Sequence, residues 1–463
     1  MNLNQVTMQL KDLPQPKGKW PLGNLAEFKE ANKHRVIEKW SKECGDIFKI
    51  SLAGKKFIVS VDPELNGKIL KMRPEKFSRF NKINEVFQEL GINGVFNAEG
   101  EDWYKHRKPA AEALNAKNVK LYYPIVAKNT IELLNHIERH QQNNINVSAM
   151  SMKYTIDITT EIAFGYALNT LNESGKNFQE KLEKIFPMIN KRISAPFPYW
   201  RYFKSKKDKE LEESLKSVET QINEFIEHAE KKLETQPTAS NFLEALLIES
   251  KEDNFSTKEV FGNVFTMLLA GEDTTSNSIS WAVFYLSQHP EWIAKIRTEA
   301  NEIYGNNSVP ETYEDLQKLS LANAVAQEAI RLKPTTPQLF MQANEDVLIN
   351  DLAIEKGQVV MLQNMVAQTA DNFFTDGENF HPERWLKAQC PYHEKHHPQY
   401  MRAFGAGPRF CPGMKLAMDE LTMAISTVCK HYNFELTVPV ESVIEKFAFT
   451  MQAENLIVRF TAN

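Results

Sequence analysis

The sequence predicts a mainly α-helical protein with small β-sheets, and three observations support this fold class. Residues from about 120 to 335 show apolar side chains at helical spacing almost throughout. The stretch "IFKISLAGKKFIVSVD" (47–62) places β-branched and aromatic residues around a glycine turn, which is typical of a hairpin. Short strands are predicted again at 346–362 and near the C-terminus, at "FELTV" and "NLIVRF".

Composition favours one large globular domain over residues 1–463. Of these residues 42% are hydrophobic and 25% charged, and the sequence shows no repeat or Gly/Ser linker. A proline-containing leader is expected over 1–20, and a β-rich portion mainly over 40–65 and 335–365. The net charge of −5 gives no reason to expect nucleic acid as a partner.

The cysteine content and the N-terminus favour a cytoplasmic protein. Four cysteines in the whole chain form no disulfide framework. The first residues contain no apolar run long enough for a signal peptide or a membrane helix, so we expect no transmembrane anchor. We further expect a monomer.

Two long helices stand out in the middle of the chain. Residues 208–234 have a charged face suited to solvent, whereas residues 257–288 are apolar nearly all round and are expected to be buried. At about 1.5 Å per residue the second helix would span about 48 Å. Its centre nevertheless reads "AGEDTT" (270–275), and buried acids and hydroxyls are costly unless they have partners or a task.

The segment "FGAGPRFCPG" (404–413) surrounds Cys411 with glycine, proline and arginine. A small buried thiol at a helix start is one interpretation. The other is a functional thiolate, because a helix is predicted to follow directly and helix N-termini favour negative charge. Arg409 offers a forked cation suited to a carboxylate, so the loop suits an axial ligand of a haem with propionates.

This loop resembles the haem-binding segment of the cytochrome P-450 (haem-thiolate) monooxygenases. The positions that match in register are Phe404, Gly407, Arg409, Cys411 and Gly413. The resemblance implies haem b as cofactor, Cys411 as its iron ligand and O2 as co-substrate. It also implies the family's single large fold, with a long buried central helix over the haem.

"AGEDTT" resembles the family's central-helix motif, which assigns Asp273 as the acid and Thr274 as the alcohol that deliver protons during reductive activation of dioxygen. A structural alternative is that the Thr274 hydroxyl bonds a carbonyl one turn earlier. By resemblance, Trp103 and Arg107 of "WYKHR" bind a haem propionate. For this pair the alternative is an aromatic–cation surface contact.

"EAIR" followed by "HPERW" resembles the family's structural Glu-Arg-Arg network. The matching residues are Glu328, Arg331 and Arg384, and we expect a buried, hydrogen-bonded triad. Two departures from the family pattern occur: Gln342 stands where a third propionate-binding arginine is common, and "TAD" (369–371) stands where His-Arg-Asp is usual. The first leaves the neutralisation of one propionate unexplained.

The expected activity is insertion of one oxygen atom of O2 into a C–H bond of a lipophilic small molecule, such as a fatty acid, a terpenoid or a sterol-like compound. The substrate-facing candidates are Phe96, Leu269, Ala270, Leu339 and Phe340. The alternative for each is plain packing in the core, where Phe and Leu occur far more often than in pockets. The turn "APFPYWRYF" (195–203) is expected to be a lid, a membrane-touching surface or plain packing.

The sequence shows no flavin or nicotinamide fingerprint and no cysteine set for an iron–sulfur cluster, so a separate electron donor of the ferredoxin/ferredoxin reductase or flavodoxin type is expected. The cations of 105–108 and Lys415 are candidates for docking it. Two alternatives stay open: a peroxide-driven peroxygenase or hydroperoxide isomerase, and a non-enzymatic haem-based carrier or sensor. The acid–alcohol pair argues against both.

Overall fold

The computed structural model describes residues 8–28, 32–140, 143–172, 176–252, 255–386, 391–447 and 449–463. The chain divides into two compact units. Unit 1 comprises Met1–Glu85, Arg331–Arg384 and Ala388–Cys411, and unit 2 comprises Val86–Ile330, Trp385–Lys387 and Pro412–Asn463. Each is described by itself.

Unit 1 is built on a five-stranded sheet with the order β1-β2-β8-β5-β3. Its strands are β1 (Ile47–Leu52), β2 (Lys55–Ser60), β3 (Phe77–Arg79), β5 (Gln338–Ala343) and β8 (Val359–Gln363). The predicted hairpin is confirmed, because β1 and β2 pair antiparallel from Ile47–Ser60 to Leu52–Lys55. Within this sheet β2 and β8 pair in parallel, with Val59 opposite Met361, and the other described pairs are antiparallel. The second hairpin, β6 (Val347–Ile349) and β7 (Leu352–Ile354), lies inside the predicted 346–362 stretch.

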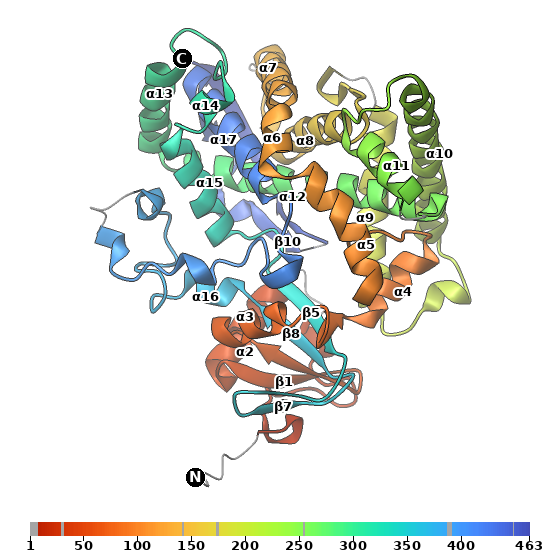
Figure 1. Cartoon of the computed structure of the whole chain (residues 1–463). Helices are drawn as coiled ribbons and strands as arrows, with labels where there is room; N and C mark the ends of the chain where they lie inside the picture. Colours follow the sequence, from red (N-terminus) through yellow and green to blue (C-terminus); the bar gives the residue numbers. More distant parts are fainter. Residues whose placement is uncertain are drawn as a thin grey trace, which may run out of the picture. The chain divides into compact units, whose positions relative to one another are not determined.

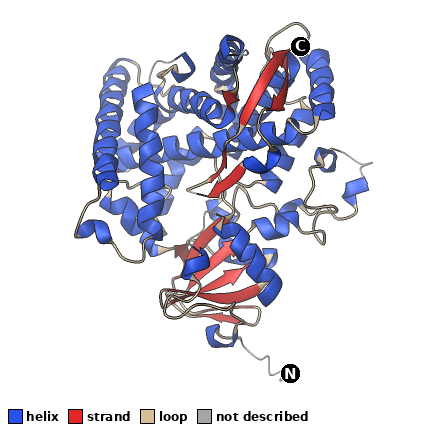
Figure 2. Cartoon of the chain, turned by 180° about the vertical axis from the view of Figure 1, so that it is seen from behind, coloured by secondary structure: helices blue, strands red, loops and turns tan. Residues whose placement is uncertain are grey.

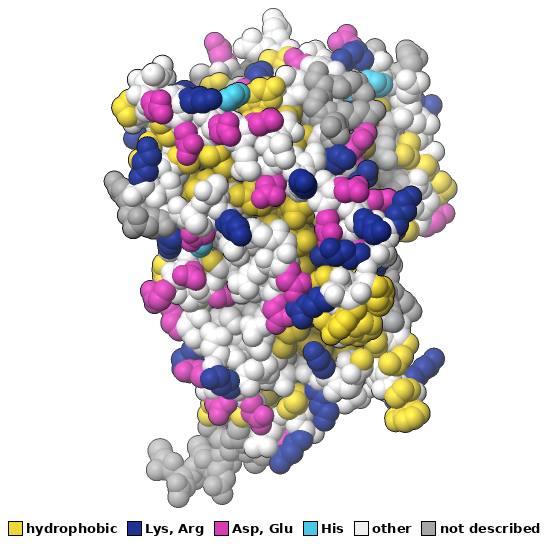
Figure 3. Space-filling model, turned by 90° about the vertical axis from the view of Figure 1, so that its right-hand side faces the viewer, with side chains coloured by type: hydrophobic (Ala, Val, Ile, Leu, Met, Phe, Trp, Pro, Cys, Tyr) yellow, Lys and Arg dark blue, Asp and Glu magenta, His cyan; other side chains and the backbone are white. Residues whose placement is uncertain are grey.

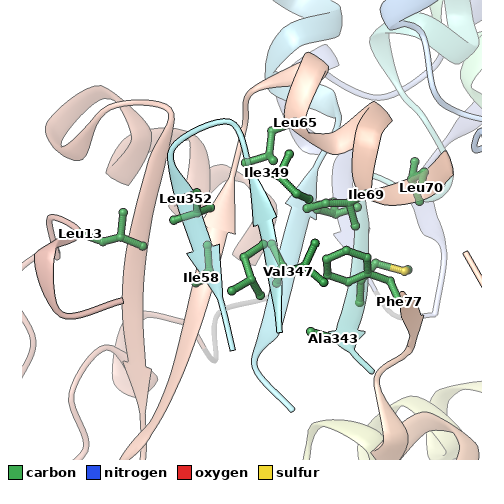
Figure 4. Packing of buried hydrophobic residues seen from close by; sticks show 14 residues of the cluster. Leu13, Ile58, Leu65, Ile69, Leu70, Phe77, Ala343, Val347, Ile349 and Leu352 are labelled. Atoms are coloured by element: carbon green, nitrogen blue, oxygen red, sulfur yellow. The ribbon is translucent and has the colours of Figure 1, made fainter. Parts of the chain in front are cut away.

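Hydrophobic clusters cover both faces of this sheet. Strand β8 is buried along its whole length, and its residues alternate between the two clusters. One cluster includes Ile58, Phe77 and residues of α3 (Pro63–Lys71), as Figure 4 shows. The other includes Trp40 of α2 (Lys33–Cys44). Leu13 is also buried in the first cluster, so part of the predicted leader belongs to the core of unit 1.

Unit 2 is mainly helical. Two helices, α4 (Asn81–Glu89) and α15 (Ser320–Leu332), have residues in both units. The helices that lie wholly in unit 2 include α5 (Gly100–Ala113), α6 (Ala116–Leu121), α7 (Tyr123–His140), α8 (Val147–Phe164), α9 (Lys176–Ser194), α10 (Lys206–Thr235), α11 (Phe242–Glu252), α12 (Thr257–Leu286), α13 (Pro290–Tyr304), α14 (Tyr313–Leu316) and α17 (Met414–His431). The two long predicted helices are confirmed as α10 and α12. Figure 1 shows α12 among the other helices of this unit, and it contacts α8, α10, α11 and α17.

The predicted C-terminal strands are confirmed as β9 (Tyr432–Leu436) and β12 (Ile457–Ala462), which pair antiparallel, with β4 (Ile145–Asn146) on the other side of β12. A separate hairpin, β10 (Ile444–Phe447) and β11 (Met451–Glu454), packs on α12 through β11. Figure 2 shows strands in red and helices in blue, with a red strand close to the C-terminus. Among the described residues, no helix combines the length and the apolar character needed to cross a membrane.

Candidate active site

The segment that contains Cys411 is a tight loop closed by backbone hydrogen bonds. The Cys411 amide donates to the Phe404 carbonyl at 2.9 Å, and the Phe410 amide donates to the Gly407 carbonyl at 3.0 Å. Gly405 and Gly407 have φ values of 76° and 70°, which other residues rarely adopt. The loop therefore fixes the backbone at both ends of the segment that leads to the sulfur.

Gly407 is also required by a close neighbour. A Cβ at this position would lie 2.6 Å from the Leu70 carbonyl oxygen and 2.8 Å from Cα of Lys71, at the end of α3. Glycine at position 407 therefore allows the loop to lie close to the backbone of α3. Gly413, in contrast, has a φ of −84° and is the N-cap residue of α17.

Cys411 precedes that N-cap by two residues, as the sequence predicted, and its side chain is half-buried. A sulfur at a helix N-terminus is stabilised as a thiolate, which is the form that binds iron. Arg409 is half-buried in the same loop. A thiol ligand with a nearby guanidinium is a donor set that fits a haem with its propionates.

Arg331 and Arg384 are fully buried in unit 1 and donate to backbone carbonyls. Arg331 donates to the carbonyls of Gln368 and Gly377 at 2.5 and 2.6 Å. Arg384 donates to the Thr375 carbonyl at 3.1 Å. These bonds fix the 368–379 segment, which fits a structural role for both arginines.

Glu328, the third member of the predicted network, is buried in unit 2. It accepts a 2.9 Å hydrogen bond from the indole of Trp385.

Helix α5 carries Trp103 and Arg107 on one face, and the guanidinium lies 6.0 Å from the indole ring centre. Trp103 is buried and Arg107 half-buried. The predicted juxtaposition is present, and its geometry also fits the aromatic–cation alternative.

Asp273 of α12 is buried and held by three side chains. Thr450 donates to its Oδ2 at 2.6 Å, Asn277 donates to its Oδ1 at 3.1 Å, and Gln452 lies 3.5 Å from Oδ1. Burial raises the pKa of Asp273, and these hydrogen bonds oppose that rise. A carboxyl group with a raised pKa can carry a proton nearer to neutral pH.

Thr274 donates to the Ala270 carbonyl one turn earlier, at 2.5 Å. The local bond that the structural alternative requires is therefore present. It uses the only hydroxyl hydrogen but leaves the oxygen able to accept a hydrogen bond.

Glu272 is a buried acid that the sequence analysis did not single out. It is 1% exposed, and its Oε2 has no hydrogen-bond partner in the described part of the chain. Burial, reinforced by the neighbouring carboxyls of Asp273 and Glu183, raises its pKa well above the ordinary range. No signal in "AGEDTT" distinguishes which of the two adjacent acids has hydrogen-bond partners.

The substrate-facing candidates lie in different surroundings. In unit 2, Phe96 is half-buried, Leu269 is buried and Ala270 is exposed. In unit 1, Leu339 packs beside the cluster that includes Ile58, and the Phe340 ring lies 6.5 Å from that of Phe80.

The two units divide the predicted site residues between them. Unit 1 contains Phe404, Gly407, Arg409, Cys411, Leu339, Phe340, Arg331 and Arg384, and unit 2 contains Gly413, Trp103, Arg107, Asp273, Thr274, Phe96, Leu269, Ala270 and Glu328.

The cations considered for partner docking are engaged by carboxylates of the same chain. Lys105 pairs with Glu259 at 2.8 Å, Lys108 pairs with Glu249 at 2.6 Å, and Lys415 pairs with Asp419 at 2.5 Å. On the face drawn in Figure 3, basic and acidic side chains are interspersed. These lysines therefore do not form a purely basic docking patch.

Residues 13–460 match the sequence model of the family described as Cytochrome P450. The chain belongs to the cytochrome P450 family. It is accordingly an oxidoreductase of the haem-dependent monooxygenase class, and the match runs through residues of both units. The resemblance read from the Cys411 loop is thereby confirmed at the level of the family.

Similar P450 proteins occur in distant organisms. Cytochrome P450 72A68 of Medicago truncatula is 26% identical over 83% of this chain and 75% of its own length. 11-oxo-beta-amyrin 30-oxidase of the same plant is 25% identical over 81% of this chain and 72% of its own. Cytochrome P450 monooxygenase sphH of Aspergillus fumigatus is 24% identical over 94% of this chain and 85% of its own.

Proposed function

We propose that this P450 inserts one oxygen atom of O2 into a C–H bond of a lipophilic small molecule, with electrons supplied by a separate protein. The observation that carries the proposal is the acid–alcohol pair on α12. Asp273 is buried, hydrogen-bonded and raised in pKa, and Thr274 follows it directly. A buried proton-carrying acid beside a hydroxyl is what delivery of protons to a site shielded from bulk water requires.

The residues assigned to the cofactor are Cys411, Arg409, Phe404, Gly407, Gly413, Trp103 and Arg107. Cys411 would bind the iron of haem b, and Arg409 with Arg107 would neutralise propionates. When bound, the haem supplies a thiolate-ligated iron at which dioxygen is reductively activated. The tight 404–411 loop serves to hold the sulfur in one position.

Two residues of the chain would move protons. Asp273 carries a proton and is replenished from solvent. Thr274 accepts a hydrogen bond at its oxygen and passes the proton on through its hydroxyl, which requires the local bond to Ala270 to break or be shared. Asn277 and Thr450 keep Asp273 oriented.

An apolar substrate is supported by the aromatic surroundings of Phe96. Its ring centre lies 5.1 Å from that of Phe87 and 5.9 Å from that of Phe449. Leu269, Ala270, Leu339 and Phe340 complete the set that we assign to the substrate side. A relative named for oxidation of 11-oxo-beta-amyrin is consistent with a terpenoid substrate.

We assign the electron donor to the ferredoxin or flavodoxin type. The scarcity of cysteine supports a reducing compartment such as the cytoplasm. Because Lys105, Lys108 and Lys415 are already paired, docking would require exchange of their intramolecular ion pairs.

Turnover under isotopically labelled dioxygen tests this function. The haem-loaded protein is supplied with a ferredoxin, its reductase and reductant, and a panel of fatty acids, terpenoids and steroids. One labelled oxygen atom in a hydroxylated product supports the proposal. Product that forms only with added peroxide, from unlabelled peroxide oxygen, would instead establish a peroxygenase.

A further inference from the structure

The loop that carries Phe96 lies directly on the backbone of α12. A Cβ at Gly94 would lie 2.3 Å from the carbonyl oxygen of Gly262. A Cβ at Gly262 would lie 2.0 Å from the carbonyl oxygen of Asn93. Real Cβ atoms do not approach so closely, so glycine is needed on both sides. This contact brings the loop to the N-terminal half of α12.

Asn263, the next residue of α12, joins three elements through its side chain. Its Oδ1 accepts from the Val95 amide at 3.0 Å. Its Nδ2 donates to the Glu259 carbonyl at 2.8 Å and lies 2.6 Å from Nδ1 of His106 on α5. Asn263 is 1% exposed, so these contacts are shielded from water. We call this group of bonds the Asn263 clasp.

The chemistry of the partners fixes the orientation of the amide. The Val95 N–H can only donate and the Glu259 carbonyl can only accept, so Oδ1 must face the loop and Nδ2 the helix. The remaining Nδ2 hydrogen points to His106, whose Nδ1 must then be an acceptor. His106 is therefore neutral in the clasp, with its hydrogen on Nε2, which lies 3.7 Å from the Glu259 carboxylate.

The surroundings of His106 favour this neutral form. Burial lowers the pKa of His106, and Lys105 lowers it further. The carboxylates of Glu259 and Asp102 act in the opposite direction, and a ring from the segment before α12, that of Phe255, lies 5.2 Å from the imidazole. The clasp is thus complete at neutral pH and loses its His106 bond when the imidazole is protonated.

Phe96 follows Val95 directly, so the clasp controls its place in a row of aromatic rings. From Phe96 the row continues to Phe449 at 5.9 Å, from there to Phe186 at 6.4 Å, and then to Phe265 of α12 at 6.3 Å. Both ends of the row are therefore tied to α12, one through the clasp and the other through the helix itself. The same helix carries Asp273 and Thr274.

We propose that Asn263 is a specificity-determining positioning residue that acts through the Val95 amide on Phe96. This inference rests on the proposed function, in which Phe96 borders the substrate. With the clasp closed, the Phe96 ring limits where the apolar part of a substrate lies relative to Asp273 and Thr274 at the centre of α12. With the clasp open, the loop moves away from α12 and the substrate binds in more than one orientation.

The first test measures amide hydrogen exchange of Val95 in the haem-loaded ferric protein. Asn263→Ala is expected to speed exchange at Val95 at least about tenfold, because its acceptor is lost. The matched control is Ser280→Ala, which removes a buried hydroxyl of the same helix whose printed hydrogen bond, among the described residues, goes to the Ser276 carbonyl. The control should exchange at Val95 like the wild type. Unchanged exchange in Asn263→Ala would overturn the clasp.

The second test uses Asn263→Asp and reverses a pH dependence. In the wild type, acidification protonates His106 and speeds Val95 exchange relative to the intrinsic rate. In Asn263→Asp, the carboxylate still accepts from the Val95 amide, and acidification lets the protonated His106 donate to that carboxylate, which tightens the clasp and slows relative exchange. A purely space-filling role predicts the same pH trend in both proteins, and that result would contradict the proposal.

The third test measures substrate specificity, with lauric acid and progesterone as probes. Asn263→Ala is expected to weaken their binding, measured by the absorption change of the haem, by about tenfold and to broaden the distribution of oxidation positions on any probe that is turned over. If Asn263→Ala speeds Val95 exchange but leaves probe binding and product positions unchanged, the clasp holds the loop without affecting the substrate. That result would overturn its role in specificity. If the wild type itself oxidises nothing with reductant, the proposed function fails while the exchange result still decides the clasp.

Discussion

The Thr450 hydroxyl, in the turn between β10 and β11, donates a 2.6 Å hydrogen bond to the Asp273 carboxylate on α12. The two residues are 177 positions apart in the sequence. Asn277 contacts both of them, at 3.1 Å from the Thr450 hydroxyl and 3.1 Å from Asp273 Oδ1. The acid assigned to proton delivery is thus oriented by a segment that carries no recognisable motif.

Thr450→Val should impair proton delivery without removing the acid. Loss of one hydrogen bond of about 1 kcal/mol leaves Asp273 less well oriented and raises its pKa further, so we expect about fivefold less product per electron pair. The pH profile should move to higher pH. Thr450→Ser, which keeps the hydroxyl, is the matched control and should behave like the wild type. Equal coupling in the valine and serine variants would contradict this role.

Thr274→Ala should divert electrons from product to peroxide or water. A positioned proton donor contributes about a hundredfold or more to such steps, although water can substitute in part, so at least about a tenfold fall in coupling is expected. The measurement is product and peroxide formed per reductant consumed. Thr275→Val tests the neighbouring buried threonine and should retain coupling. Unchanged coupling in Thr274→Ala would show that its hydroxyl only bonds the Ala270 carbonyl.

Arg331→Ala should yield unstable, haem-poor protein. The guanidinium is fully buried and its bonds to the Gln368 and Gly377 carbonyls have no substitute in the variant. Leaving buried partners of a charged group unsatisfied costs about 3 kcal/mol or more. Denaturant unfolding and haem content provide the measurement. Half-buried Arg35 on α2, whose side chain is 40% exposed and pairs with Glu38, gives the matched Arg35→Ala control, with little expected change. Recovery of stable, haem-loaded Arg331→Ala would count against the assignment.

Glu272→Gln should stabilise the protein as pH rises. The folded-state pKa of Glu272 lies above its ordinary value of 4.5, so the folded state holds the proton more tightly than the unfolded state. The wild type therefore loses stability as pH increases from about 4.5 towards the folded-state pKa, whereas glutamine is neutral throughout. For each pH unit by which the folded-state pKa of Glu272 exceeds its ordinary value, the difference in unfolding free energy between Glu272→Gln and wild type grows by about 1.4 kcal/mol.

Unfolding free energies of Glu272→Gln and wild type at pH values on both sides of neutrality test this linkage. Glu180→Gln, on the exposed side of α9, is the control and should not develop the same pH-dependent gain. A constant difference between Glu272→Gln and wild type across the range would mean that the carboxyl is charged in the folded state.

Local patterns predicted the secondary structure well, because helices such as α10 and α12 and the β1–β2 hairpin depend on the spacing of apolar residues and on turn chemistry. The family was also accessible from the sequence, since the Cys411 loop concentrates several constrained residues in one segment. The close approach of Gly407 to α3 could not be predicted from the sequence, because a local pattern does not identify a contact partner that is distant in the chain.

The partners of the buried acids were missed for the same reason. The resemblance singled out Asp273, but nothing in "AGEDTT" shows which of Glu272 and Asp273 has a distant hydrogen-bond partner. The fold gives Asp273 its bond to Thr450, whereas Glu272 Oε2 has no partner among the described residues. The burial of Leu13 and the Asn263 clasp are likewise tertiary features. The docking lysines were considered from charge alone, and their intramolecular partners became visible only in the structure.

The absorption spectrum of the reduced protein under carbon monoxide tests the central claim, that the Cys411 sulfur ligates haem iron. Thiolate ligation shifts the main band strongly to the red, and we predict this band in the wild type and its loss in Cys411→Ser. Cys429→Ser, at a fully buried cysteine of α17, should keep the shifted band if the variant folds. A wild-type spectrum without the shift, or a shifted band that persists in Cys411→Ser, would contradict the account.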